Sequence, residues 1–381
     1  MLPALQVKGD GLRRLVRYLD ALIRTVRFPG KAFHFVDWLA QQEEYAGLTT
    51  LYPADVARCF SRYCGVPAEL VSDDHALSVE QIAQQLAQRV IGQPDACGRC
   101  AGVLARFKAR INDPDLPLGT FLFVGPTGVG KTELAKQLAR YLFGDERRMV
   151  RLDMSEYMTG ASAQRLLEVG RGVTSLAQRV REQPLLLILL DEIEKAHPQV
   201  FDLLLGVLGE GRLTDGMGRL IDFRMTLIVM TSNLGAGSGA VAGFGDRVGA
   251  DHLRQVRRHF RPEFFNRIDH VIPFASLSPA DILRIVDLVL EDTRQRTGLV
   301  RRGMRLVVSR PAREHLARVG FHPTRGARPL RRAVEALVVT PLAVMLSAKP
   351  QLADLTLQVV TADEPPSRVA ASAPTRRKGA Q

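Results

Sequence analysis

The stretch GTFLFVGPTGVGKT, residues 119–132, decides the fold of this chain. Its residues 120–125 are typical of a buried strand, a glycine-rich turn follows, and helical spacing starts at Lys131. The turn fits the pattern G-x-x-x-x-G-K-[ST], in which successive backbone N–H groups surround a phosphate and the helix adds its positive end. We therefore expect the turn to bind a nucleotide through Gly125, Pro126, Thr127, Gly128, Val129, Gly130, Lys131 and Thr132.

Two side chains of this turn have distinct expected roles. Lys131 reaches the outer phosphates, and the hydroxyl of Thr132 binds Mg²⁺. The pattern alone arises by chance in glycine-rich turns, but here it follows a strand and opens a helix. The sequence therefore predicts a site for ATP with Mg²⁺.

A second signal is the segment LLLILLDE, residues 185–192. A buried strand that ends in two adjacent acids delivers them to the carboxyl edge of a parallel sheet, where ligands bind. We expect Asp191 to support the Mg²⁺ and Glu192 to polarise the attacking water as a general base. An ordinary helix N-cap is the simpler alternative for Asp191. The apolar run before it, in a chain with a phosphate-binding turn, favours the nucleotide site.

Polar residues also end the apolar run MTLIVMTSN, residues 225–233. We expect Asn233, at this strand end, to hold the same water or the γ-phosphate. Taken alone, the residue is better explained by turn chemistry. Together with the two preceding motifs, the catalytic role becomes the preferred interpretation.

Apolar runs separated by helical spacing predict a parallel sheet covered by helices on both faces. The expected strands are residues 120–125, 149–154, 185–191 and 225–233. After Pro273 the pattern is mainly helical, which indicates a second and smaller unit with two short strands. Outside the sheet, the expected helices are residues 95–110, 131–142, 278–296, 311–319 and 327–346, and the short strands are residues 304–308 and 355–360.

Composition excludes several classes of protein. The 381 residues suffice for roughly two or three compact units without disulfides or metals. The apolar run at 185–190 is six residues long, whereas a membrane span needs about 20. We expect a cytoplasmic protein with no membrane partner and no export signal. Free thiols are expected at the four cysteines, with a zinc site as the alternative, at Cys59, Cys64, Cys97 and Cys100.

The charge is strongly basic and uneven. The chain holds 52 basic and 40 acidic residues, a net charge of +12. Between Asp251 and Arg332 there are 18 arginines and 8 acidic residues, so most of the excess lies there. Solvated helix faces explain most of these arginines, and contact with polyphosphate explains others. Because no RNA-binding signature or zinc-finger spacing accompanies the charge, a nucleic-acid partner is not expected.

Six further motifs can be recognised along the chain. They are DMSEYM at 153–158, LLDEIEKAHPQVFDLLLGVL at 189–208, GRLTDGMGRLIDFR at 211–224, TSNLG at 231–235, FRPEFFNRID at 260–269 and GARPLRRAV at 326–334. With the phosphate-binding turn, this series resembles the second AAA+ module of the Clp-type (ClpA/ClpB) chaperone ATPases. The resemblance covers about residues 51–360. It implies a P-loop α/β subdomain followed by a small, mainly helical lid subdomain.

The resemblance implies roles that the motifs alone do not assign. Arg267 matches the arginine finger, which acts on the γ-phosphate bound by a neighbouring subunit, and Arg261 is a weaker candidate for such a contact. Arg328 matches the sensor-2 arginine of the lid. Val90 and Ile91, in RVIGQPDA, match the residues that flank adenine. An arginine that acts across a subunit boundary needs a ring with head-to-tail interfaces, so a homo-oligomer, normally a hexamer, is expected.

The same resemblance suggests domain boundaries. Residues 1–50 are a helical segment, either a remnant of a first-module lid or a simple helical cap. The expected order is then a connector over 51–85, the ATPase subdomain over 86–275, the lid over 276–362 and a disordered tail over 363–381.

The resemblance implies a ring ATPase that converts ATP and water to ADP and phosphate and remodels, unfolds or disaggregates non-native proteins. Two segments depart from the family. Its threading loop carries a Tyr, whereas residues 158–200 contain no Phe, Tyr or Trp and Arg171 stands near that position. The protease-docking tripeptide reads Ala242-Gly243-Phe244 here, so a protease or partner Clp subunit is only weakly indicated. The alternative is an ATP-switched adaptor or regulatory subunit that threads nothing.

Overall fold

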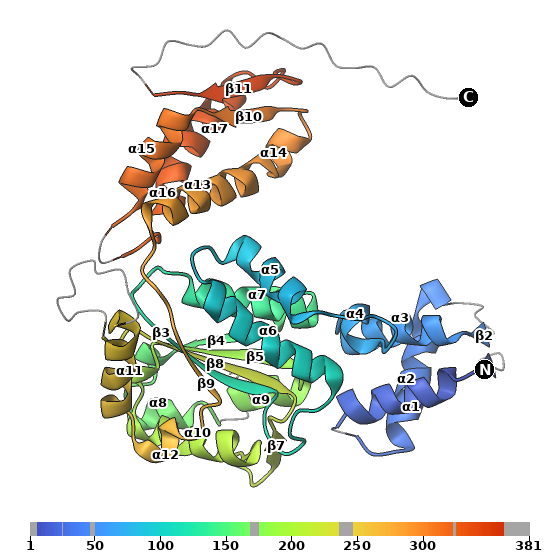
Figure 1. Ribbon diagram of the computed structural model, residues 1–381. Coiled ribbons are helices and arrows are strands. Elements are labelled where there is room, and N and C mark those ends of the chain that lie inside the picture. Colours follow the sequence, from blue (N-terminus) through green and yellow to red (C-terminus); the bar gives the residue numbers. More distant parts are fainter. Residues whose placement is uncertain are drawn as a thin grey trace, which may run out of the picture. The chain divides into compact units, whose positions relative to one another are not determined.

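The computed structural model describes residues 6–24, 26–45, 50–167, 175–235, 247–322 and 325–361, without the side chains of 247–252 (Figure 1). The chain divides into two compact units, Met1–Ser276 and Leu277–Gln381. The first unit carries a five-stranded sheet with helices on both faces. The predicted α/β fold class, a P-loop sheet followed by a small helical unit, is confirmed.

The central sheet is parallel throughout, with the strand order β4-β5-β8-β3-β9. The three inner strands are buried along their whole length, which explains their continuous apolar runs. The register pairs Asp153 with Asp191, so the polar ends of β4 and β5 meet at one edge, here called the carboxyl edge. The strand bounds are β3 (Gly119–Val124), β4 (Met149–Asp153), β5 (Leu186–Asp191), β8 (Thr226–Ser232) and β9 (His270–Pro273).

Helices cover both faces of this sheet (Figure 1). One face is covered by α5 (Val79–Arg89), α6 (Pro94–Ala109) and α7 (Lys131–Phe143). The other is covered by α8 (Gly160–Gln164), α9 (Leu176–Glu182), α10 (Pro198–Glu210), α11 (Arg247–His259) and α12 (Pro262–Phe265). A buried cluster on this second face holds the helices to the strands and includes Leu122, Ile188, Leu190, Val200 and Phe264. Shorter elements are β6 (Arg212–Thr214), β7 (Leu220–Asp222), and the 3₁₀ turns Glu43–Tyr45, Glu146–Arg148, Met154–Glu156 and Ile193–Lys195.

The N-terminal elements pack around aromatic side chains. They are β1 (Gln6–Val7), α1 (Gly11–Leu22), α2 (Gly30–Gln41), β2 (Thr50–Leu51), α3 (Pro53–Cys64) and α4 (Ala68–Val71). Rings of Tyr18, Phe35 and Phe60 lie with centroids 5.6 to 6.0 Å apart, joining α1, α2 and α3. Helix α3, which lies in the segment expected to be a connector, therefore contributes to this aromatic core.

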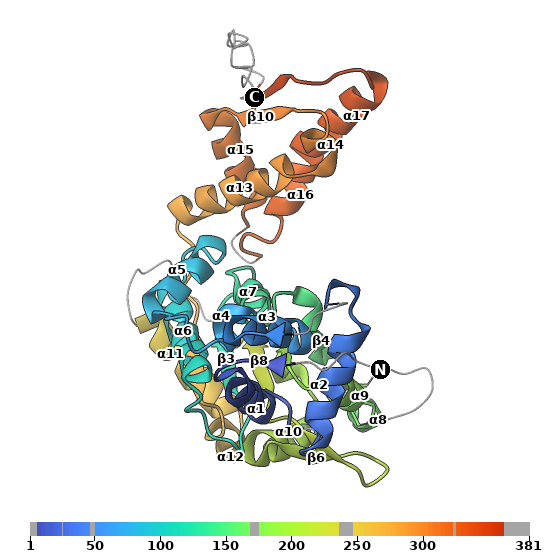
Figure 2. The same ribbon diagram turned by 90° about the vertical axis from the view of Figure 1, so that its right-hand side faces the viewer.

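The second unit, whose helices and strands Figure 2 shows, has its own buried apolar core. It consists of α13 (Pro279–Arg294), α14 (Thr297–Val300), α15 (Arg310–Gly320), α16 (Leu330–Val334) and α17 (Thr340–Ala348), with β10 (Arg305–Val308) parallel to β11 (Thr356–Val359). Apolar residues at helical spacing on α13, namely Ile282, Val286 and Leu290, pack in this core against Leu316 and Val334.

The predicted strands and most predicted helices are confirmed within a few residues, and differences appear at β9 and in the last predicted helix. The fifth strand, β9, was not predicted, because it has four residues of which Ile272 alone is fully buried. The helix predicted over 327–346 is confirmed as an uninterrupted helical run over 330–348, but its middle segment, Glu335–Val339, is π-helical and separates α16 from α17. Pro341 has no N–H for the carbonyl four residues earlier, and the Thr340 hydroxyl donates to the Glu335 carbonyl oxygen at 2.9 Å.

Three predicted features lie outside the described residues. They are Arg171 in the expected threading loop, the tripeptide Ala242-Gly243-Phe244, and the tail 363–381. Within the part of the chain that the structure describes, no helix combines the length and apolar character needed to cross a membrane.

Candidate nucleotide site

The turn between β3 and α7 is shaped by glycines in backbone conformations that other residues avoid. Gly125, Gly128 and Gly130 have φ of 152°, 77° and 108°. A Cβ added to Gly125 would lie 2.8 Å from the carbonyl oxygen of Phe274, so this residue has neither the angle nor the space for a side chain. Gly130 is the N-cap of α7, which leaves the first N–H groups of that helix directed at the turn.

Lys131 is the first residue of α7 and is 7% exposed. Its ammonium donates to the carbonyl oxygens of Gly125 and Pro126, the latter at 2.8 Å, and to Oδ1 of Asn233 at 2.8 Å. These hydrogen bonds compensate for the burial of a charge. These carbonyl and amide oxygens are uncharged, whereas a phosphate is anionic and accepts a stronger hydrogen bond from an ammonium.

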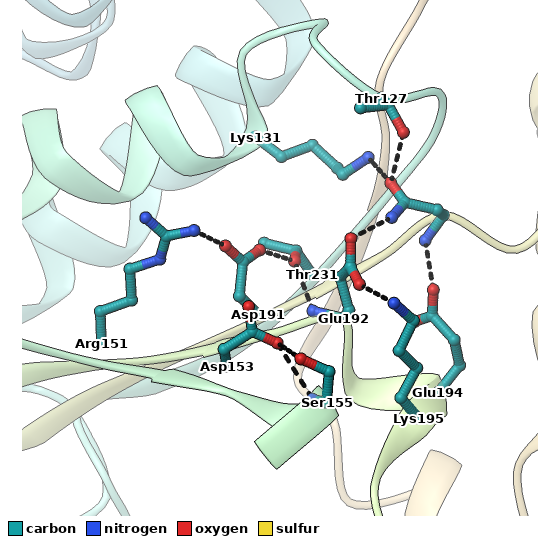
Figure 3. Close-up of polar contacts among 11 residues, drawn as sticks. Thr127, Lys131, Arg151, Asp153, Ser155, Asp191, Glu192, Glu194, Lys195 and Thr231 are labelled. Atoms are coloured by element: carbon teal, nitrogen blue, oxygen red, sulfur yellow. Dashed lines mark hydrogen bonds and ion pairs between the residues drawn. The ribbon is translucent and has the colours of Figure 1, made fainter. Parts of the chain in front are cut away.

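Asp191 ends β5 at the carboxyl edge and is 7% exposed (Figure 3). Its Oδ1 accepts a hydrogen bond from the hydroxyl of Thr231, and its Oδ2 accepts one from Nη2 of Arg151 at 2.6 Å. The Thr231 hydroxyl also accepts the backbone N–H of Glu192 at 3.1 Å. The hydroxyl proton is thereby directed at Asp191, which fixes the carboxylate in place.

Glu192 has a left-handed backbone, with φ 58° and ψ 52°. This region is unfavourable for a non-glycine residue, and such strain is found mostly where function requires it. The conformation places the carboxylate between Asn233, whose Nδ2 donates to Oε1 at 3.2 Å, and Lys195, which forms an ion pair with Oε2. The hydrogen bond to Glu192 raises the pKa of Lys195 above its ordinary value.

Asn233 links the phosphate-binding turn to the acidic strand end. Its Oδ1 accepts from Lys131, its Nδ2 donates to Glu192, and its backbone N–H donates to Oε1 of Glu194 at 3.0 Å. The second carboxylate oxygen of Glu194 is buried and has no hydrogen-bond partner within the described residues. The structure therefore brings Lys131, Glu192 and Asn233, each predicted separately, into one chain of hydrogen bonds.

The predicted adenine-side residues lie against the phosphate-binding turn. Val90 and Ile91 are 2% and 7% exposed, and a Cβ added to Gly130 would lie 3.6 Å from Cγ1 of Val90. The buried amide of Gln93 donates to the carbonyl oxygens of Val129 at 3.2 Å and Ala275 at 2.9 Å. These bonds attach the segment after α5 to the turn.

Arg267 lies at the opposite edge of the sheet, here called the amino edge. Its carbonyl oxygen accepts the hydroxyl of Thr120 at 3.5 Å, near the start of β3, and its guanidinium donates to the carbonyl oxygen of Leu205 in α10. The six residues of β3 span about 17 Å. Within one chain, the structure does not bring Arg267 to Lys131. Arg261 forms an exposed ion pair with Asp202 at 2.9 Å.

Arg328 belongs to the second unit, where it is exposed just before α16. Its backbone N–H donates to the carbonyl oxygen of Arg325 at 3.3 Å. Its role as a sensor of the nucleotide remains a prediction.

The residues present fit ATP and Mg²⁺. The glycine turn, the start of α7 and Lys131 provide N–H groups and a positive charge for phosphates. Thr132, half-buried in the first turn of α7, and Asp191 offer the oxygen donors that Mg²⁺ prefers.

Several contributing residues were missed by sequence reasoning. Arg151, Lys195, Glu194, Thr231 and Gln93 all contact a predicted site residue or its neighbours. Thr231 and Lys195 stand inside motifs already quoted, so their proximity was available as a signal. Arg151 could have been found from the strand register, because it lies on the edge strand beside β5.

The cysteines are buried free thiols, and they take no part in the contacts of the site described above. Burial raises the pKa of Cys64 to about 12 and that of Cys97 to about 11. His197 is the N-cap of α10 and accepts the N–H of Gln199 at 3.3 Å, so its contact is a structural one.

Comparisons with known proteins agree with this geometry. A family model described as AAA domain (Cdc48 subfamily) matches residues 116–271, and one described as the C-terminal, D2-small domain of ClpB protein matches residues 277–358. The chain is similar to the chaperone protein ClpB of Mycobacterium bovis, 46% identical over 302 residues that cover 78% of this chain and 34% of that protein. ClpB of Nitratidesulfovibrio vulgaris is 40% identical over 82% of this chain and 37% of its own length.

Two solved structures are also similar. One is titled S. cerevisiae Hsp104-ADP complex, with a TM-score of 0.79, 30% identity, and coverage of 94% of this chain and 64% of that one. The other is a closed-state reconstruction of Hsp104 with ATPγS and FITC casein, with a TM-score of 0.75, 28% identity, and coverage of 94% and 63%. The chain thus spans about a third of the length of the curated relatives it matches.

Proposed function

The chain belongs to the Clp-type AAA+ chaperone ATPases, in which it corresponds to the second module of ClpB, and we propose that it binds and hydrolyses ATP to remodel other proteins. The observation that carries the proposal is the hydrogen-bonded chain from Lys131 through Asn233 to Glu192. It joins a phosphate-binding turn to a carboxylate that is placed to act on water.

Binding is proposed to begin at the glycine turn. The N–H groups of the turn and of the α7 N-terminus receive the phosphates, and Lys131 leaves its carbonyl partners for the phosphate oxygens. This movement frees Oδ1 of Asn233 to accept a hydrogen bond from the attacking water. Mg²⁺, held through Thr132 and Asp191, would neutralise developing charge on the phosphates. Val90 and Ile91 provide an apolar surface for the adenine ring.

Hydrolysis is proposed to use Glu192 as the general base. The carboxylate takes a proton from water as the water oxygen bonds to the γ-phosphorus, and the bond to the β–γ bridging oxygen breaks to give ADP and phosphate. Both carboxylate oxygens of Glu192 have donors, one from Asn233 and one from Lys195. Glu192 therefore gives up one of these two donors when it accepts the proton of the attacking water.

The proposal includes a ring. Arg267 lies at the amino edge, about one strand length from the turn of its own chain, so it would serve a neighbouring subunit. A homo-hexamer is the arrangement we propose, with Arg328 of the lid unit responding to the nucleotide. The domain boundaries suggested by the sequence are retained as part of the same proposal.

Non-native polypeptides are the proposed substrates, and the cytoplasm is the proposed location. The similarity to ClpB and to Hsp104, whose solved structure includes casein, supports remodelling over an adaptor role. The free thiols suit a reducing compartment. Residues 158–200 contain no Phe, Tyr or Trp that could grip a polypeptide. Threading of the substrate therefore needs a test of its own.

The test combines assembly, turnover and substrate response. The purified protein is sized with and without ATP, phosphate release is measured, and casein is added as an unfolded substrate. We expect nucleotide-dependent assembly, turnover, and stimulation by casein. A protein that stays monomeric with every nucleotide and releases no phosphate contradicts the proposal. Turnover that responds to a partner protein but not to casein favours the adaptor role.

A matched variant tests threading. Arg171→Tyr restores an aromatic grip at the expected loop, and Arg171→Gln removes the charge without adding one. Casein stimulation should increase in the first variant and not in the second. An equal response in both variants contradicts the assignment of Arg171 to this loop.

A further inference from the structure

The ion pair between Arg151 and Asp191 has no role in the proposed hydrolysis. We propose that the Arg151 guanidinium stands in for the metal ion in the nucleotide-free site and competes with Mg²⁺ for the Asp191 carboxylate. The inference rests on the proposed function, because it assumes that Asp191 supports Mg²⁺. It adds a residue that sets the metal dependence of nucleotide binding.

The contacts of Asp191 show which of its two carboxylate oxygens can exchange its partner for a metal ion. Oδ1 is held by the Thr231 hydroxyl, which is itself engaged by the Glu192 N–H at 3.1 Å. Breaking that contact would leave the Thr231 hydroxyl, which holds the Glu192 backbone, without its acceptor. Among the described residues, Oδ2 has Arg151 as its partner, at 2.6 Å. A metal ion that draws on Asp191 therefore meets Arg151 first.

Strand register explains how Arg151 reaches this position. In the β4–β5 pair, Arg151 lies opposite Leu189 and Asp153 opposite Asp191. Arg151 and Asp191 are thus diagonal neighbours on one face of the sheet, a separation that a long side chain spans. Helix α7, which carries Thr132 in its first turn, packs against β5.

Asp191 and Arg151 differ in burial, so replacing Arg151 by a metal ion has different costs for the two side chains. The side chain of Asp191 is 10% exposed, and that of Arg151 is 45% exposed. A displaced guanidinium can be hydrated at small cost, whereas the buried carboxylate needs a cation at all times. Arg151 therefore neutralises Asp191 while the site is empty and yields when the metal arrives with the nucleotide. The presence of Arg151 should lower the apparent affinity for Mg²⁺.

The experiment measures metal dependence without turnover. In a Glu192→Gln background, which should retain bound ATP, fluorescent N-methylanthraniloyl-ATP is bound at fixed concentration and Mg²⁺ is titrated. Arg151→Met should lower the half-saturating Mg²⁺ concentration by about five-fold or more, the lower end of typical coupling between sites. Arg151→Lys, which keeps a charge but not the planar fork, should fall between the two.

Controls separate this inference from general loss of charge. Arg140→Met removes an arginine that pairs with Glu146 near the end of α7 and should leave the Mg²⁺ titration unchanged. In EDTA, Arg151→Met should bind the fluorescent nucleotide more weakly than the parent, because Asp191 is then an uncompensated anion beside phosphates. If Arg151→Met fails to fold, Arg151→Lys provides the titration.

The outcomes are distinct. An unchanged or increased half-saturating Mg²⁺ concentration in the Arg151 variants, with the nucleotide still bound, overturns the competition and leaves the proposed function intact. Failure of the parent itself to bind the nucleotide at any Mg²⁺ concentration contradicts the proposed function instead. A lowered Mg²⁺ requirement confined to the Arg151 variants supports the inference.

Discussion

The two edges of the sheet differ in how complete they are within one chain. At the carboxyl edge, Lys131, Asp191, Glu192 and Asn233 are joined by hydrogen bonds to one another or to shared neighbours. At the amino edge, the guanidinium of Arg267 donates to a backbone carbonyl of α10 and is far from any phosphate its own chain would bind. One edge is a nearly finished site, and the other offers the guanidinium of Arg267.

The difference teaches how the proposed activity depends on assembly. Because parallel strands collect their carboxyl ends at one edge, a single chain can build the phosphate and water side of the reaction. In the proposed ring, the arginine at the other edge would serve a second copy, so that hydrolysis would be a property of the interface. Substitutions at the two edges should therefore differ in their effects on nucleotide binding, turnover and the free energy of unfolding.

The largest effect is expected at the amino edge. Arg267→Ala should lower turnover of the assembled ring by about 10³-fold or more, because an arginine supplied in trans stabilises charge on the transferred phosphate. Nucleotide binding should be retained, since the turn lies at the opposite edge. Mixing this variant with Lys131→Ala subunits should restore part of the activity, as each supplies what the other lacks. No recovery at any mixing ratio contradicts the trans assignment.

At the carboxyl edge, Glu192→Gln should reduce phosphate release by about 10²-fold to 10⁴-fold while ATP still binds. The amide preserves the shape of the side chain but accepts no proton. Phosphate release and fluorescent-nucleotide binding are measured in parallel, with Glu182→Gln, on α9, as the matched control. Turnover near that of the parent would remove Glu192 from the role of base.

A smaller effect is expected from the bonds that hold the amino edge. The buried Thr120 donates its N–H and its hydroxyl to Oδ2 of Asp269, at 2.8 and 2.7 Å, and its hydroxyl accepts the Asp269 N–H at 2.9 Å. Thr120→Val should lower the free energy of unfolding by about 1–2 kcal/mol, measured by urea denaturation. Thr120→Ser keeps the hydroxyl and should lose less. Equal losses in the two variants would contradict the importance of these bonds.

The smallest effect is expected at the thiols, which lie outside both edges. Because burial raises the pKa of Cys64 to about 12 and of Cys97 to about 11, both are protonated in the folded chain at pH 8. Alkylation should be slow until the pH approaches those values, and fast at pH 8 after unfolding. The same shifts make stability fall as the pH rises above the ordinary thiol range, because the unfolded chain releases these protons first. Rapid alkylation of the folded protein at pH 8 would contradict this.

Sequence reasoning reached most of the sheet and the central residues of the site. Continuous apolar runs predicted β3, β5 and β8, because strands covered on both faces need apolar residues at every position. The short edge strand β9 lacks that signature, and it was missed. The hydrogen bonds of Asn233 could not be predicted as such, although its place at a strand end was. The left-handed conformation of Glu192 leaves no periodic pattern in the sequence. The same is true of the π-helical segment between α16 and α17.

What the sequence determined by itself was the order of elements and the kind of chemistry at their ends. The glycine turn, its lysine and the two adjacent acids are each formed by residues that follow one another in the chain. Such local features can be recognised from the sequence. The tertiary structure alone decided which distant residues meet: Arg151 with Asp191 across a strand pair, Gln93 with Val129, and Arg267 with α10 at the far edge. These contacts depend on strand order and register. Both are set by pairing between segments that are distant in the sequence.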